Sequence, residues 1–272
     1  MRAFRAPLTT DGGPMERTTG QKLLAEFIGA FALIFIGAGS IIAGFGGGGL
    51  INVAFAYGLA LATMVTALGH VSGGHFNPAV TIGAWVTQKL DGANAVRYIG
   101  AQLAGGAAAA GVLRAAIPET FWRAGNLGTP SVNASLDVGQ AVLIEAVLTF
   151  FLVWVFFATA IDPDGAFAKI AGLAIGFVVV MGVLTGGTFT GAAMNPARWF
   201  GPALLSGFWT HWWVYLVGPI AGGIVAAVVY DSMILRPTEA PVQDTAPDEI
   251  PHGIGAHGAE GEHEHEHEHH GD

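Results

Sequence analysis

The sequence predicts an all-α membrane protein in which six transmembrane helices and two half-helices form an inverted repeat. The 272-residue chain is 52% hydrophobic and only 11% charged, with 41 glycines, a composition typical of membrane proteins. Several apolar runs reach the roughly 20 residues that a helix needs to cross a bilayer. The triplet Asn-Pro-Ala also occurs twice, at 77–79 and at 195–197, each time beside a long apolar run.

The two Asn-Pro-Ala triplets predict two half-helices. Asn77 and Asn195 are favoured N-cap residues, and Pro78 and Pro196 would occupy the first helical position, where a missing N–H costs nothing. The apolar runs that follow reach only to about residues 88 and 206, too short to cross a membrane. Non-helical backbone at membrane depth is tolerated where it lines a cavity or is buried in protein. The pair therefore indicates a pore; two proline-initiated surface helices are the disfavoured alternative.

In chain order, the first half contains an arm, two spans, a half-helix and a third span. Residues 1–20 are polar, and we expect a flexible cytoplasmic arm. Apolar runs at 23–44, 50–68 and 95–116 are the predicted spans, and the glycines at 46–49 form a turn. The first half-helix lies between the second and third spans, and the polar stretch 89–92 closes it.

The second half repeats this order. Residues 117–136, with two prolines and two glycines, form the longest internal loop, and Asp-Pro-Asp-Gly at 162–165 is a strong turn signal. Spans are predicted at 138–161, 168–185 and 212–235, with the second half-helix before the last. The channel domain thus covers residues 21–235, with repeats at about 21–117 and 138–235. Residues 236–272 are expected to form a disordered, acidic, His-rich tail.

Lysine and arginine positions predict the orientation. With the N-terminus inside, eight of the 11 basic residues lie in cytoplasmic segments, whereas only Arg114 and Arg123 lie outside and Arg198 lies in the second half-helix. This asymmetry favours both termini in the cytoplasm. Six spans also require both termini on one side, so the two arguments agree. We expect an integral protein of the plasma or inner membrane.

A pair of acidic residues extends the repeat. Glu26 precedes Asn77 by 51 residues, and Glu145 precedes Asn195 by 50. Each half therefore contains three spans, an odd number, so the two halves must be inserted in opposite senses. Inverted repeats with broken helices place the site near the bilayer midplane. Carboxylates within a membrane are costly and need partners. We expect Glu26 and Glu145 to have a scaffold role, and proton coupling in a transporter is the alternative.

Over residues 20–235, the chain resembles the aquaporin, or major intrinsic protein, family. Two correctly placed triplets with paired glutamates form a specific signal, whereas one triplet would be weak. The resemblance implies a homotetramer with one pore per subunit, passing water and small uncharged solutes. It rests on Ala25-Glu26-Phe27, on the stretch from Gly69 to Thr81, on Tyr98-Ile99-Gly100-Ala101-Gln102, on Glu145 and on Met194-Asn195-Pro196-Ala197-Arg198.

The same resemblance implies roles for the site residues. Glu26 and Glu145 would hold the half-helix loops through backbone N–H groups. The half-helix dipoles would place positive potential at the pore centre and repel cations, including hydronium. His75 would line the cytoplasmic half of the pore. The pore centre would consist of Asn77, Pro78, Ala79, Asn195, Pro196 and Ala197.

In the family that the chain resembles, four positions form the outer constriction. Counting from the triplets places them at Tyr57, Val183, Ala192 and Arg198. Strict water channels typically have His where Val183 stands, so this ring is expected to be wider and more apolar. Glycerol channels usually have Asp at the position of Trp199, which argues against a dedicated glycerol channel. The pattern resembles the plant vacuolar branch that is permeable to ammonia or urea. We therefore expect water flux together with ammonia, hydrogen peroxide or urea, and a strict water channel is the alternative.

Composition narrows the partners. The net charge is -9, but ten of the 20 acidic residues follow Arg236, so the body is near neutral and suggests no nucleic-acid partner. The chain has no cysteine, and no catalytic set or cofactor site is evident. Seven of the ten histidines follow Pro251. This tail could bind Zn²⁺ or Ni²⁺ weakly, or be a solvated spacer or a purification tag.

Three classes of function remain open at this point. A passive channel needs no driving ion gradient, whereas a coupled transporter, which inverted repeats also suit, stops when its gradient is collapsed. A structural junction protein with a closed pore would show no permeability in reconstituted vesicles. An enzyme is disfavoured, because the body of the chain holds no catalytic constellation.

Overall fold

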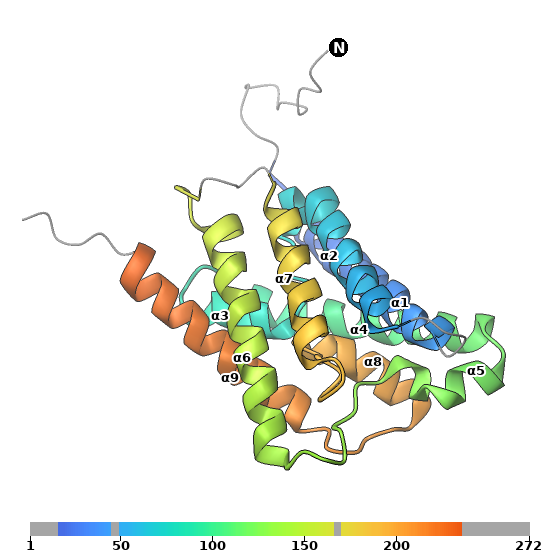
Figure 1. Ribbon diagram of the computed structural model, residues 1–272. Coiled ribbons are helices and arrows are strands. Elements are labelled where there is room, and N and C mark those ends of the chain that lie inside the picture. The colour runs from blue at the N-terminus through green and yellow to red at the C-terminus, as the bar shows by residue number, and fades with distance from the viewer. Residues whose placement is uncertain (1–15, 45–48, 166–169, 236–272) are drawn as a thin grey trace, which may run out of the picture. The chain divides into compact units, whose positions relative to one another are not determined.

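In the computed structural model, residues 16–44, 49–165 and 170–235 are described, and all their regular elements are helical (Figure 1). The first repeat contains α1 (Thr19–Gly44), α2 (Leu50–Ser72), α3 (Pro78–Val86) and α4 (Gly92–Ala116). The second contains α6 (Val138–Phe156), α7 (Ala171–Gly186), α8 (Pro196–Ser206) and α9 (Val214–Tyr230). π-Helical turns at Phe157–Ile161 and Asp231–Leu235 extend α6 and α9.

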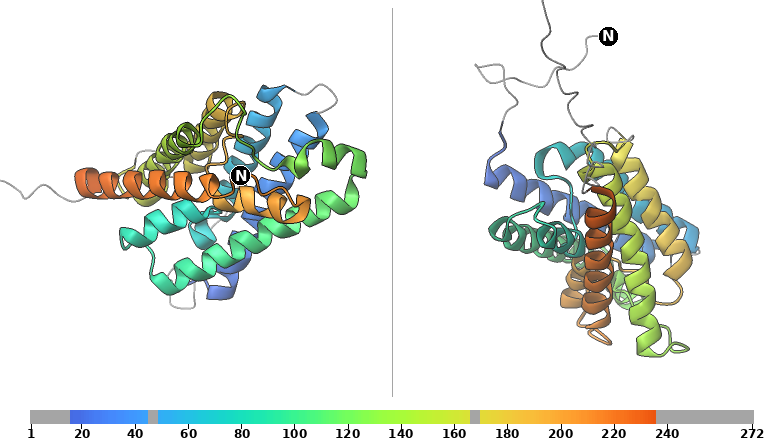
Figure 2. Two further views of the ribbon diagram at one scale, coloured as in Figure 1. Left: turned by 90° about the horizontal axis from the view of Figure 1, so that it is seen from below. Right: turned by 90° about the vertical axis from the view of Figure 1, so that its left-hand side faces the viewer.

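Helix contacts confirm the predicted repeat. In the first repeat α1 packs on α4, and in the second α6 packs on α9 in the same way. Likewise, α4 contacts α8, and its counterpart α9 contacts α3. The pair α1 and α2 recurs as α6 and α7, while α2 packs on its own counterpart α7. Both short helices, α3 and α8, contact α4 and α9 (Figure 2). The fold is therefore the one the sequence predicts, with six long helices and two half-helices.

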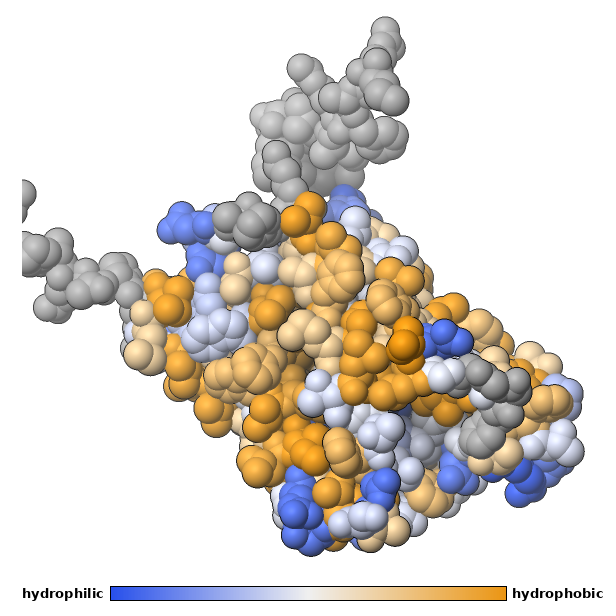
Figure 3. Space-filling view, viewed as in Figure 1, coloured by the Kyte–Doolittle hydropathy of each residue, from blue (hydrophilic) through white to orange (hydrophobic). Residues whose placement is uncertain are grey.

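Four of these helices are long and apolar enough to cross a membrane: α1, α2, α6 with its π-helical turn, and α9 with its own. α7 is apolar but has only 16 described residues, and it follows directly on residues that lie outside the description. α4 has 25 residues but a lower mean hydropathy, because alanine and glycine dominate it. Figure 3 shows large apolar side chains gathered over the middle of one face, with hydrophilic residues above and below.

Glycines allow the closest helix contacts. A Cβ on Gly222 of α9 would collide with the backbone oxygen of Ala146 in α6, and one on Gly176 of α7 would collide with Gly58 in α2. The small-residue spacings Gly172/Gly176 and Gly218/Gly222 therefore serve helix packing.

The predicted loop at 117–136 contains a short α-helix and a 3₁₀ turn at Asn126–Gly128, neither of which the sequence pattern indicates. α5 (Glu119–Ala124) contributes the buried Trp122, and the guanidinium groups of Arg114 and Arg123 each lie 5.1 Å from its ring centroid. Helix starts also differ slightly: α1 begins at Thr19 and α4 at Gly92. Asp91 caps α4 by accepting hydrogen bonds from Asn94, which lower the pKa of its carboxyl.

Candidate functional site

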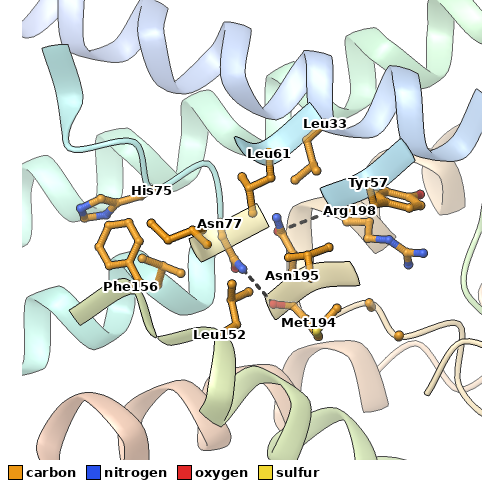
Figure 4. Close-up of a pocket in the computed structure, with 15 residues that line it drawn as sticks. Leu33, Tyr57, Leu61, His75, Asn77, Leu152, Phe156, Met194, Asn195 and Arg198 are labelled. Atoms are coloured by element: carbon orange, nitrogen blue, oxygen red, sulfur yellow. Dashed lines mark hydrogen bonds between the residues drawn. The ribbon is translucent and has the colours of Figure 1, made fainter. Parts of the chain in front are cut away.

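The two half-helices begin next to each other. Asn77 caps α3, since its side-chain oxygen accepts from the N–H of Ala79 at 2.9 Å, and its amide nitrogen donates to the carbonyl of Met194 at 2.8 Å (Figure 4). Asn195 mirrors this arrangement in α8, with its amide nitrogen 2.9 Å from the carbonyl of Phe76. Both positive helix ends therefore point at one location.

Glu26 holds the first of the two connecting loops. Its carboxylate accepts hydrogen bonds from the N–H groups of His75 and Phe76 at 3.0 and 2.7 Å. The Ser72 hydroxyl and the Gln102 amide donate to it as well, at 2.6 and 2.7 Å. The carboxylate is completely buried, and these donors offset the cost of burying it.

Glu145 does the same for the second loop. The N–H groups of Ala193 and Met194 donate to it, both at 2.8 Å, as does the Thr190 hydroxyl at 2.7 Å. Tyrosines brace both loops: Tyr98 donates to the carbonyl of Ser72, and Tyr215 to that of Thr190. The two glutamates thus have equivalent surroundings, apart from the extra Gln102 amide at Glu26.

These loops contain strained backbone. Phe76, Ala192 and Met194 have φ values of 48°, 45° and 52°, in the left-handed region that residues with a Cβ rarely adopt. Such strain persists only where the surroundings over-determine the conformation. The glutamate hydrogen bonds to neighbouring N–H groups supply that constraint.

A narrow cavity of about 20 Å³ runs past the two asparagines, which is room for about one water molecule at a time. Its walls are mostly apolar, with a few polar groups. Among its lining residues are Leu33, Leu61, Val80, Leu152, Ile175 and Val179.

Tyr57 and Arg198 form one end of this cavity. The Arg198 guanidinium lies 4.2 Å from the centroid of the Tyr57 ring, and its Nη2 donates to the carbonyl of Gly191 at 2.9 Å. Its Nε and Nη1, like the Tyr57 hydroxyl, are buried and have no protein partner. Gly37 leaves the space that the Tyr57 ring fills. Three unpaired polar groups therefore meet at this end.

Of the four residues expected at the outer constriction, the structure brings Tyr57, Ala192 and Arg198 together around the narrow cavity. Val183 lines a neighbouring cavity of about 280 Å³, which also includes Arg198, Thr188, Asn133 and Ser131. Arg198 thus lies between the two cavities, and Val183 lies on the wider side of it.

His75 lies at the other end of the narrow cavity. Its Nδ1 lies 3.1 Å from the Thr81 hydroxyl, and its ring makes edge contacts with Tyr98 and Phe156 at centroid distances of 5.5 and 5.3 Å. The narrow cavity thus brings together six of the expected site residues: Tyr57, His75, Asn77, Ala192, Asn195 and Arg198. Val183 and the Pro-Ala pairs at 78–79 and 196–197 are not among its lining residues.

Sequence reasoning gave no role to several residues that build this site. Gln102 and Tyr98 lie in a stretch that the family resemblance singled out, and that signal could have identified them. No comparable signal marks Phe156, Leu152 or Val179, because their neighbours in the spans are also apolar. Within the described ranges, no three metal-ligating side chains come together; the His-rich tail lies outside them.

Comparisons with known proteins agree with this geometry. A family model described as "Major intrinsic protein" matches residues 15–230. Aquaporin TIP4-4 of Zea mays is 43% identical over 223 residues, covering 78% of this chain and 86% of that protein. Aquaporin-4 of Mus musculus is 40% identical over 217 residues, covering 76% and 65%. The X-ray structure of the aquaglyceroporin from Plasmodium falciparum superposes with a TM-score of 0.71 at 26% identity, covering 80% of this chain and 97% of that one.

Proposed function

The chain belongs to the major intrinsic protein family of membrane channels, and from that premise we propose a passive pore for water and a small neutral solute. Ammonia, hydrogen peroxide and urea are the candidate solutes. The observation that carries the proposal is the Tyr57–Arg198 end of the narrow cavity. It offers unpaired polar groups to a permeant, while Val183 and Ala192 add only small apolar surface.

The asparagine pair explains how water passes without protons. Each amide uses one N–H on a loop carbonyl and its oxygen as a helix cap, which leaves a second N–H for a passing water oxygen. Because both helix dipoles are positive here, the central water is oriented and cations are repelled. Arg198 adds a fixed positive charge. Cations and protons are therefore excluded while neutral molecules pass.

A strict water channel is the second candidate. The volume of about 20 Å³ in the narrow cavity favours it, since a cavity of that size holds about one water. Urea would need the lining side chains to move apart.

Stopped-flow measurements on purified protein in proteoliposomes separate these readings. Water, ammonia, hydrogen peroxide, urea and glycerol would be compared in the same vesicles. We expect flux of water and of at least one of ammonia, hydrogen peroxide and urea. A protein that conducts water but excludes all three is the strict water channel.

Val183→His tests the solute range within the same assay. The imidazole would narrow the approach to Arg198 and add a donor, so we expect unchanged water flux and lower solute flux. Equal ammonia and hydrogen peroxide flux in the variant and the wild type would remove Val183 from the selectivity ring.

Assembly and placement also belong to this proposal. We expect a homotetramer with one pore per subunit, in the plasma or inner membrane, with both termini in the cytoplasm. The excess of lysine and arginine in the expected cytoplasmic segments supports that orientation.

A further inference from the structure

Three cavities follow one another along the path through the described helices. The narrow cavity shares Arg198 with the outer one of about 280 Å³. Beyond its opposite end lies a third cavity of about 300 Å³, lined by Val65, Gly69, Gly73 and Thr159 among others. The widest spaces therefore lie at the two ends, and the narrow cavity separates them.

The boundary between the narrow cavity and the third one runs through His75 and Phe156. On α2, Leu61 lines the narrow cavity, and Val65, one turn later, lines the third. On α6 and the turn that follows it, Phe156 lines the narrow cavity and Thr159 the third. The two rings face each other edge-on at 5.3 Å (Figure 4).

Hydrogen bonds fix the His75 ring at this boundary. The Thr81 hydroxyl donates its proton to the carbonyl of Asn77 at 3.0 Å and accepts from Gln102 at 2.9 Å. The Thr81 hydroxyl then has no proton left for His75, so in their contact His75 Nδ1 carries the proton and is the donor. Nε2 is left as an acceptor, close to Gly73 on the wall of the third cavity.

Phe156 has no such polar role, and its bulk is its contribution. It is 2% exposed and lies against His75. The next residue, Phe157, is equally buried but packs on Tyr230 at a ring distance of 6.1 Å and lines neither cavity. The chain thus offers two adjacent phenylalanines, one on the path and one off it.

We propose that Phe156, set against the fixed ring of His75, is a second size-determining residue at the cytoplasmic end of the pore. This inference rests on the proposed function and specifies its solute range. Two constrictions in series limit flux at the narrower one, so a wide outer ring at Val183 does not by itself admit a larger solute. The Phe156 ring lets water and ammonia pass and restricts urea.

The test compares urea, ammonia and water flux in proteoliposomes containing wild type, Phe156→Ala, Phe156→Leu or Phe157→Ala. Removing the Phe156 ring should raise urea permeability several-fold, with a smaller rise for Phe156→Leu and none for Phe157→Ala. Water and ammonia flux in Phe157→Ala should match the wild type, because Phe157 lines neither cavity. Phe156→Leu decides the matter if Phe156→Ala does not yield a monodisperse protein.

Wild-type urea permeability in both Phe156 variants, with water flux intact, would overturn the inference. An equal rise in Phe157→Ala would also overturn it, because the effect would then reflect loosened packing. Failure of the proposed function gives a different result in the wild type itself: no water flux, or water flux with none of ammonia, hydrogen peroxide and urea. The two failures are therefore distinguishable in one set of vesicles.

Discussion

In the proposed channel, Arg198 is the residue on which cation exclusion at the outer constriction depends. It is 3% exposed, and its Nε and Nη1 have no protein partner. Replacing it in Arg198→Val removes both the charge and the bulk, so we expect higher solute flux and a measurable proton leak. A pH-sensitive dye inside proteoliposomes reports the leak. Unchanged solute flux together with no leak would remove Arg198 from the constriction.

Glu145 supports the site without lining it. In Glu145→Ala, the N–H groups of Ala193 and Met194 and the Thr190 hydroxyl would lose their acceptor. Each buried donor left unsatisfied costs about 1–3 kcal/mol, so we expect a lower melting temperature in detergent and lost water flux.

Glu119→Ala is the matched control for that prediction. Glu119 pairs with Arg123 on the surface, where the side chains are 62% and 66% exposed. Its removal should change stability by no more than about 0.5 kcal/mol. If both variants melt alike, Glu145 does not hold the loop. If the wild type and Glu119→Ala show proton-coupled flux and Glu145→Ala does not, a coupled transporter is favoured instead.

Single residues also show how far sequence reasoning reaches. Asn77 and Asn195 could be predicted, because a cap followed by proline has a local physical signature. The glutamates followed from their nearly equal spacings to the triplets, 51 and 50 residues. Phe156 could not be found this way, since α6 is apolar on all sides and its pattern does not separate pore-facing from lipid-facing positions.

At the scale of elements, close packing of α6 on α9 depends on Gly222. An added methyl in Gly222→Ala would collide with the Ala146 backbone, and overpacking of this kind typically costs about 1–3 kcal/mol. We expect a lower melting temperature and a smaller yield of monodisperse protein.

Gly100→Ala in α4 provides the comparison, because a Cβ there meets nothing within 4 Å. Alanine is favoured over glycine within a helix by roughly 0.5–1 kcal/mol, so this variant should be as stable as wild type or more so. Equal melting temperatures for the two variants would show that the glycine contact is dispensable.

Element boundaries were predictable where a local signal exists. Asp137 caps α6 at the predicted start, because its side chain accepts from the N–H of Gln140. α5 was missed, since six residues inside a loop rich in glycine and proline give too short a pattern. Its place is set by Trp122 packing, a tertiary effect that the local sequence does not reveal.

At the scale of the whole molecule, large apolar side chains remain exposed on the described surface, including Leu143, Phe151, Phe177 and Met181. A bilayer or neighbouring copies must cover them in the membrane. We expect native mass spectrometry from mild detergent to give four copies of the 28.0 kDa chain. A single-copy mass under conditions that preserve water flux would contradict the tetramer.

The central claim is that water, but not protons, passes between the two half-helices. Its most direct test measures osmotic shrinkage and proton entry in the same proteoliposomes, with protein-free vesicles as the reference. We expect much faster shrinkage with protein and proton entry no faster than in the reference, with or without an ion gradient. Shrinkage at the protein-free rate, or water flux that stops when the gradient is collapsed, would contradict it.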